Sequence, residues 1–336
     1  MRLKRVNEQV IVITGGSSGI GLATARMAAH LGARVMLTSR DPVDLEQAVE
    51  AIRAEGGAAT YLVADVADLD AIKRVAAAAV HEYGALDTWV NNAGVSVYGP
   101  IETVGLMDAR RLFETNYWGV VNGTLAALPY LKANGGALIN VGSALSEAGC
   151  ALQGHFAASK HAVKAFTDSL RLELQEEGAP VAVTLIQPAA IDTPHVEHAK
   201  AYPGVETSYR SPVYAPEVVA RAILRSAEHQ ERQVPVGSAG KLRDTMEWLV
   251  PTFARRGTVG GATPSPPPET STAERDSLFG PRPGDARVRG SYPGHVRQSS
   301  LATRARQYRR QTLLGFAIAG AAVALLERAG VFGDGD

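Results

Sequence analysis

Residues 10–21 read Val-Ile-Val-Ile-Thr-Gly-Gly-Ser-Ser-Gly-Ile-Gly, an apolar run that leads into a glycine-rich turn. A short apolar run bounded by turn residues indicates a buried strand, and the apolar residues from Ile20 to Leu31 then recur at helical spacing. Such a turn presents backbone N–H groups and the positive end of the helix dipole to an anion. The pattern predicts a phosphate-binding turn; a tight turn without a ligand is the simpler alternative.

Three further motifs follow predicted strands or lie on a predicted helix. The run Asn91-Asn92-Ala93-Gly94 ends one strand, Ser143 follows another, and Lys160 lies four residues after Phe156, on the same helix face. Strands that alternate with helical stretches such as 43–55 and 68–83 predict βαβ units and a parallel sheet, with ligands beyond the carboxyl ends of the strands. The predicted strands are Val10–Thr14, Ala33–Thr38, Ala59–Val63, Leu86–Asn91, Ala137–Val141 and Val181–Gln187.

Together these motifs resemble the short-chain dehydrogenase/reductase family, from Gln9 to Val236. The resemblance implies an α/β fold, a Rossmann-like doubly wound parallel sheet with helices on both faces. It implies an enzyme that moves a hydride between a nicotinamide cofactor and a carbonyl or alcohol. It also implies a homodimer or homotetramer built on the helices that carry Asn116 and Phe156. The residues it assigns to the cofactor are Thr14, Gly15, Ser17, Ser18, Gly19, Ile20, Gly21, Arg40, Asp65, Val66, Asn92, Ala93, Gly94, Lys160, Pro188, Ile191 and Thr193.

The end of the second predicted strand bears on the choice between NAD and NADP. An acidic residue there accepts a hydrogen bond from a free ribose 2′-hydroxyl, whereas an arginine accommodates a 2′-phosphate. Ser39 stands where NAD-specific relatives have an aspartate, and Arg40 follows at once. NADP(H) is therefore expected in preference to NAD(H), with an ordinary solvated arginine as the alternative.

The family resemblance also assigns the catalytic residues. Ser143 takes the role of the serine that positions the substrate oxygen, Lys160 that of the lysine that holds the ribose, and Asn116 that of the asparagine of the water relay. The position of the catalytic tyrosine is occupied by Phe156, which has no hydroxyl group to donate or accept a proton.

Three hypotheses account for Phe156. The protein is an oxidoreductase whose proton transfer is impaired or is supplied by water or by His155; or it is a catalytically inactive NADP-binding module, a sensor or scaffold; or it is a variant copy of an active enzyme. His155 lies next to Phe156 on the helix and so points about 100° away, which favours a structural histidine.

Substrate contacts are expected from residues 195–214, which contain Tyr202, Tyr209 and Tyr214, and from Tyr98. Aromatic side chains in a loop suit an apolar substrate, but they are equally typical of ordinary packing. For Thr193, which precedes Pro194, a helix N-cap is an alternative role that is compatible with cofactor binding.

The composition bears on the partners and the compartment of the protein. Lys plus Arg and Asp plus Glu both number 34, so no net charge favours nucleic acid. The single cysteine, Cys150, fits a reducing, cytoplasmic compartment, and the apolar run at the N-terminus is too short for a signal peptide. No metal site is predicted.

The composition changes after residue 255, which sets the predicted domain boundaries. Residues 1–255 form the dinucleotide-binding and catalytic domain, and 256–300, rich in Pro, Gly and Arg, are expected to be a disordered linker. A basic and then apolar helix is predicted over 301–330. Its apolar part, 312–326, is shorter than a membrane span, so it either contacts a membrane or packs on protein.

Overall fold

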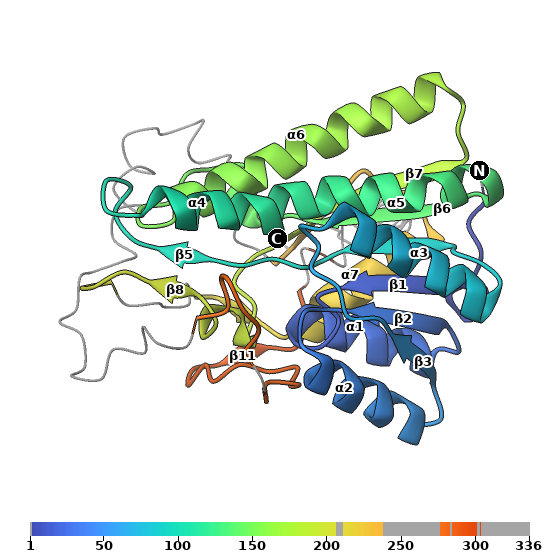
Figure 1. Ribbon diagram of the computed structural model, residues 1–336, viewed down its shortest axis with the longest axis horizontal. Coiled ribbons are helices and arrows are strands. Elements are labelled where there is room, and N and C mark those ends of the chain that lie inside the picture. Colours follow the sequence, from blue (N-terminus) through green and yellow to red (C-terminus); the bar gives the residue numbers. More distant parts are fainter. Residues whose placement is uncertain (1, 206–210, 238–275, 283, 301–302, 304–336) are drawn as a thin grey trace, which may run out of the picture.

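Seven parallel strands form the central sheet of the computed structural model, which describes residues 2–205, 211–237, 276–282, 284–300 and 303 (Figure 1). The order across the sheet is β10-β7-β6-β4-β1-β2-β3. The chain starts at β1, runs outward to β3, returns to β4 on the other side of β1 and continues to β10. This is the predicted doubly wound sheet, with its topological switch point between β1 and β4. The strands are β1 (Val10–Thr14), β2 (Arg34–Thr38), β3 (Ala58–Tyr61), β4 (Thr88–Asn91), β6 (Gly136–Val141), β7 (Val181–Pro188) and β10 (Gln233–Val236).

The six predicted strands are all present, and their ends differ from the predicted ones by at most two residues. The seventh strand, β10, was not predicted. It is an edge strand that contains Pro235, and proline is tolerated only where a backbone N–H is not needed by the ladder. A short run with an internal proline gives a weak strand pattern, which explains why it was missed.

Helices cover both faces of the sheet, as predicted (Figure 1). α1, α2 and α7 pack on one face, and α3, α5 and α6 on the other. Asp41 and Asp68 fix the starts of α2 and α3 because each carboxylate accepts hydrogen bonds from two N–H groups of the first turn. The helices are α1 (Gly19–His30), α2 (Pro42–Ala54), α3 (Leu69–Tyr83), α4 (Leu106–Phe113), α5 (Gly119–Asn134), α6 (Gly154–Glu176) and α7 (Pro216–Glu228).

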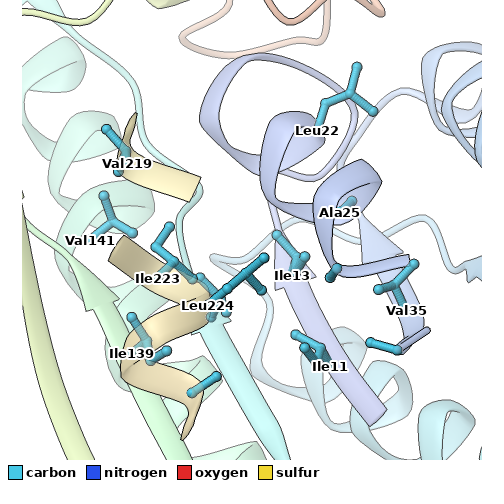
Figure 2. Close-up of a cluster of buried hydrophobic side chains, with 14 of the residues drawn as sticks. Ile11, Ile13, Leu22, Ala25, Val35, Ile139, Val141, Val219, Ile223 and Leu224 are labelled. Atoms are coloured by element: carbon cyan, nitrogen blue, oxygen red, sulfur yellow. The ribbon is translucent and has the colours of Figure 1, made fainter. Parts of the chain in front are cut away.

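Strand β1 shows how the two helical layers share the sheet. Ile11 and Ile13 belong to the apolar cluster under α1 and α7, which also contains Leu22 and Val219 (Figure 2). The alternate residues of β1, Val10 and Val12, belong to the cluster under α3, α5 and α6. Side chains of a strand alternate between faces, so a strand buried on both sides is apolar on both, as β1 is from Val10 to Ile13.

The next described residues after β10 pack on the same domain. Residues 276–282 and 284–300 lie beside the starts of α1 and α2, drawn in orange in Figure 1, and β11 (Val296–Arg297) pairs in parallel with β9 (Val213–Tyr214). A further short pair joins β5 (Val97–Tyr98) to β8 (Lys200–Ala201).

These contacts correct the prediction of a disordered linker over 256–300 for the residues that the structure describes. Leu278 and Asp285 are buried, and they are hydrogen-bonded to Arg40 and Asp44, which lie more than two hundred residues earlier in the chain. Tertiary contacts of this kind leave no local sequence pattern. The predicted helix over 301–330, with its apolar part 312–326, falls outside the described residues except for Thr303. Of the helices that are described, none is both long and apolar enough to cross a membrane.

Candidate functional site

The glycine-rich turn after β1 lies at the switch point of the sheet, where β1 and β4 are neighbours. Gly15 and Gly19 have φ angles of +62° and +53°, which residues with a side chain rarely adopt. Gly21 is required for close packing, since a Cβ atom there would lie 2.0 Å from the carbonyl oxygen of Gly15. The turn thus opens α1 with its backbone exposed, as an anion-binding turn needs.

Thr14 and Asn92 join this turn to the loop that follows β4. The Thr14 Oγ1 accepts hydrogen bonds from the backbone N–H groups of Asn92 (2.9 Å) and Ala93 (3.1 Å). In return the Asn92 amide donates to the carbonyl oxygens of Thr14 (2.9 Å) and Gly15 (3.1 Å). Two of the predicted cofactor residues, Thr14 and Asn92, therefore fix the relative position of the two loops.

A cavity of about 370 Å³ lies at the carboxyl ends of the strands, between the glycine-rich turn and the start of α6. Most of the predicted site residues line it, with contributions from five separate segments. They are Gly15, Ser18, Gly19, Ile20, Asn92, Ala93, Gly94, Ser143, Phe156, Lys160, Pro188, Ile191 and Thr193. Among the described residues, no group of three or more His, Cys, Asp or Glu side chains could hold a metal ion.

Lys160 is held at the floor of the cavity by the end of a central strand. Its Nζ donates a hydrogen bond to the carbonyl oxygen of Val141, the last residue of β6, at 3.0 Å. The side chain is buried, and burial lowers the pKa of Lys160 to about 8. The ammonium is therefore charged at neutral pH but titrates close to it.

Asn116 lies behind the cavity, in a π-helical turn (Glu114–Trp118) between α4 and α5. Its side chain bonds both backbone groups of Val95: Oδ1 accepts from the N–H (2.8 Å) and Nδ2 donates to the carbonyl oxygen (3.0 Å). Nδ2 also donates to Ser159 Oγ at 3.2 Å. Single π-helical turns are frequent at functional sites because they re-aim a side chain, and this one aims Asn116 at the loop after β4.

Ser143 caps a short 3-10 helix (Ala144–Ser146) after β6. Its Oγ accepts a hydrogen bond from Leu145 N at 3.1 Å, which leaves the hydroxyl proton available for a substrate oxygen in the cavity. Thr193 is the N-cap residue of a second 3-10 helix (Pro194–Val196), with Pro194 at its first position, and it also lines the cavity. Thr193 thus occupies an N-cap position, although its side chain makes no capping hydrogen bond, and a role in cofactor binding stays a prediction.

Phe156 faces His195 across the cavity wall, a pairing that the sequence analysis did not identify. The ring centroids lie 6.1 Å apart, and His195 Nε2 is hydrogen-bonded to Ser96 Oγ at 2.7 Å. Burial, and then the charges of Lys160 and His198, lower the pKa of His195 to about 4, so the imidazole is neutral at pH 7. His155, by contrast, is not among the residues that line the cavity.

The aromatic residues expected to contact the substrate have mostly structural positions. The hydroxyl group of Tyr202 accepts from Gly105 N (2.6 Å) and donates to Asp108 Oδ2 (2.7 Å), and Tyr214, the last residue of β9, is buried in the core. Neither lines the cavity, whereas Tyr98 does. Tyr209 lies outside the described residues.

The remaining predicted cofactor residues are away from the cavity. Ser17 lies in the glycine-rich turn, Gly21 in the first turn of α1, and Val66 packs against Gly119. Arg40 and Asp65 lie at the ends of neighbouring segments after β2 and β3, and both contact other protein groups. Asp65 Oδ2 accepts from Arg111 at 2.5 Å, and Arg40 donates to carbonyl oxygens of the chain's own C-terminal residues. The turn, the lysine and the serine are thus assembled, while the region around Arg40 is filled by protein.

Comparison with known proteins agrees with this geometry. A family model described as short chain dehydrogenase matches residues 9–203. The uncharacterized oxidoreductase YxnA of Bacillus subtilis (strain 168) is 44% identical over 259 residues, 76% of this chain and 73% of that protein.

Two solved structures are similar in fold. A short-chain dehydrogenase/reductase from Burkholderia phymatum in complex with NAD has 23% identity and a TM-score of 0.65, over 80% of this chain and all (100%) of the other. The alcohol dehydrogenase of Thermococcus sibiricus complexed with 5-hydroxy-NADP has 24% identity and a TM-score of 0.61, over 69% and 97%. The chain therefore belongs to the short-chain dehydrogenase/reductase family and is an oxidoreductase of that family with a site for a nicotinamide cofactor.

Proposed function

We propose that this protein transfers a hydride between NADP(H) and a carbonyl or alcohol substrate, with proton transfer that is impaired or supplied by a group other than tyrosine. The main support is one arrangement: Ser143 and Lys160 line the same cavity as the glycine-rich turn, with Asn116 behind them. A small-molecule substrate fits a cavity of about 370 Å³.

The nicotinamide cofactor supplies the hydride-accepting or hydride-donating carbon when it is bound. The residues of this chain that would hold it are the backbone N–H groups from Ser18 to Ile20 for the pyrophosphate, and Lys160 for the ribose hydroxyls. Pro188 to Thr193 would contact the nicotinamide end. Ser143 would donate a hydrogen bond to the substrate oxygen and so orient it.

A preference for NADP(H) over NAD(H) rests on Arg40 at the end of β2. A guanidinium can bind a phosphate through two parallel hydrogen bonds, and no carboxylate stands at the Ser39 position. The solved relatives bind either NAD or an NADP derivative, so the fold alone is compatible with both.

Proton transfer is the step that Phe156 alters. In a family member with a tyrosine, the phenol exchanges a proton with the substrate oxygen, and a positioned acid or base of this kind accelerates reactions by roughly 10²–10⁴-fold. Two other groups line the same cavity: the Lys160 ammonium, with a pKa of about 8, and the neutral imidazole of His195. Either could exchange a proton with a substrate, and His195 replaces His155 as the histidine to consider.

The second candidate is a catalytically inactive NADP-binding module that acts as a sensor or scaffold. The observation in its favour is Phe156 itself, which is buried against apolar neighbours from α4 and β5. Binding and catalysis are separable by experiment. NADPH binding is followed by the change in its fluorescence, and turnover is measured with the same protein on a panel of aldehydes, ketones and alcohols. Binding with turnover of at least one compound supports the oxidoreductase; binding with none supports the module.

We also propose a homodimer or homotetramer in the cytoplasm. Large apolar side chains are exposed on the outer faces of α5 and α6, including Leu125 (50%) and Leu172 (56%), with Trp118 (47%) just before α5. Exposed apolar side chains on adjoining helices are suited to contact with a second copy. Light scattering at micromolar concentration tests the oligomer. Membrane contact through 312–326 stays a prediction, outside the described residues.

A further inference from the structure

We propose that residues 276–287 of this chain, described except for position 283, occupy the adenosine half of the cofactor groove and must leave it before a dinucleotide can bind completely. The proposal rests on the function proposed above. Residues 276–287 are called the C-terminal segment below. Its place in the groove follows from its contacts with Arg40, with Arg111, which is paired with Asp65, and with the glycine-rich turn.

Arg40 is bound by the C-terminal segment. Its guanidinium donates hydrogen bonds to the carbonyl oxygens of Ser277, of Leu278 (3.2 Å) and of Gly280 (3.3 Å). These oxygens accept hydrogen bonds from the same guanidinium N–H groups through which an arginine binds a phosphate. Burial lowers the pKa of Arg40, in agreement with a guanidinium covered by protein. A ribose 2′-phosphate at the end of β2 would have to displace three carbonyl oxygens.

Leu278 fills the space beside Arg40. It is 1% exposed and belongs to the apolar cluster that contains Val95 and Leu112. Its carbonyl oxygen also accepts from Arg111 Nε at 3.1 Å, and the same guanidinium binds Asp65. A buried leucine between these groups occupies volume that a flat, apolar base would otherwise use.

The C-terminal segment also reaches the glycine-rich turn. The carbonyl oxygen of Arg287 accepts a hydrogen bond from Gly19 N at 3.0 Å, so one N–H at the start of α1 already has an acceptor. The segment is also held just before this point, at Gly284 and Asp285. Asp44 accepts from the N–H groups of Gly284 (2.9 Å) and Asp285 (3.2 Å), and Asp285 is paired with His198.

The groove therefore has an open half and a closed half. The residues near the nicotinamide and pyrophosphate line the cavity, whereas Arg40, Asp65 and Val66 do not. When a binding-competent state is only a fraction of the population, the apparent affinity falls by that fraction. A nucleotide that contains an adenosine is thus predicted to bind more weakly than it would if the C-terminal segment were displaced. The affinity of a nucleotide without an adenosine is predicted not to depend on the segment.

Leu278→Ala tests the proposal, with Phe279→Ala as the matched control. Phe279 is the adjacent residue and is 54% exposed, so its truncation removes an apolar side chain outside the groove. Binding of NADPH and of reduced nicotinamide mononucleotide, which lacks the adenosine, is measured with the full chain. Leu278→Ala is expected to raise NADPH affinity at least about fivefold and to change mononucleotide affinity less than about twofold. Phe279→Ala should change neither by more than about twofold.

Hydrogen exchange provides a readout that does not depend on catalysis. Amide exchange of the C-terminal segment in the natural protein should increase when saturating NADPH is added, because the nucleotide displaces the segment, and should not change with the mononucleotide. If Leu278→Ala lowers NADPH affinity, or if NADPH slows exchange of the segment, the segment forms part of the binding site and the proposal is overturned.

Two further arms separate the possible failures. Asp44→Asn weakens the anchor of Gly284 and Asp285 without touching the groove, and it should also raise NADPH affinity. If NADPH binds but neither Leu278→Ala nor Asp44→Asn raises its affinity, the role of the C-terminal segment is overturned while the proposed function stands. If no variant binds NADPH or the mononucleotide although exchange shows the segment released, the proposed function fails, and with it the assignment of the groove.

Discussion

The Nζ atom of Lys160 lies 5.8 Å from the centre of the Phe156 ring, one turn of α6 away. The lysine of a tyrosine-containing relative would stabilise a phenolate at this separation; here it faces a ring without a hydroxyl group. The groups expected to surround a tyrosine hydroxyl at this position are present, because Ser143 and Lys160 line the same cavity as Phe156.

Phe156→Tyr is expected to raise oxidoreductase turnover at least about tenfold, because it restores a general acid within reach of the Lys160 charge. The ring already fills an aromatic-sized space, so one added oxygen should cost little packing. Steady-state rates with NADPH and a carbonyl panel measure the effect, and Phe156→Leu, which adds no hydroxyl, should not raise turnover. Unchanged turnover in a natural protein that is already fast would mean that another group supplies the proton.

His195→Gln is expected to lower turnover about tenfold in the natural protein and less than about twofold in the Phe156→Tyr background. The reason is that the imidazole would exchange the proton only while the phenol is absent. His155→Gln is the control, since His155 does not line the cavity and its replacement should leave both rates unchanged. Equal effects of His195→Gln in the two backgrounds would assign the residue to substrate packing.

The affinity for NADPH is expected to fall as pH rises through about 8. Below that pH the Lys160 amine is an ammonium and can donate charge-assisted hydrogen bonds to the ribose; above it the group is neutral, because burial lowers its pKa to about 8. The loss should be about tenfold in affinity, the size of one hydrogen bond to a charged group. Fluorescence titration across the range measures it. Lys160→Met should bind more weakly and show no inflection near pH 8; a flat profile in the natural protein would place the ammonium away from the ribose.

Arg40→Asp is expected to weaken binding of NADP(H) far more than of NAD(H), because a carboxylate repels the 2′-phosphate. Competition binding with both cofactors gives the ratio. Arg26→Asp serves as the control, since Arg26 lies on α1 in an exposed ion pair with Glu55. Equal losses for the two cofactors would remove Arg40 from the reading of the 2′ position. Because Arg40 also binds the C-terminal segment, the ratio of the two affinities is the informative quantity rather than either affinity alone.

Local patterns were sufficient to predict six of the seven strands of the sheet and the position of the glycine-rich turn after β1. The apolar run Val10–Thr14, the glycines behind it and the four-residue spacing of Phe156 and Lys160 are set by neighbours in sequence, so the elements and their ligand-facing ends can be recognised. Tertiary structure decided the rest. His195 lies in the loop that was expected to contact the substrate, and it lines the cavity. Its position opposite Phe156, however, depends on how β7 and α6 meet.

The C-terminal segment shows the same limit more clearly. Its proline- and glycine-rich composition is typical of disorder, and its hydrogen bonds to Arg40 and Asp44 join residues separated by 238 and 241 positions in the chain. No local propensity records such contacts. Composition predicts whether a segment can fold alone; it does not predict whether a preformed surface will order it.

The hydrogen bond from Lys160 to Val141 ties the lysine side chain of α6 to the end of β6. Val141 ends a strand that is buried along its whole length, and Ser143 follows it by two residues. The end of β6 therefore fixes the positions of both the Lys160 ammonium and the Ser143 hydroxyl, although Lys160 belongs to helix α6. Small shifts of α6, such as those imposed by an interface on its outer face, would bend the four-carbon stem of the lysine before they altered the distance between the two groups. Residues on the outer surface of α6 can thus change without altering the distance between the Lys160 ammonium and the Ser143 hydroxyl.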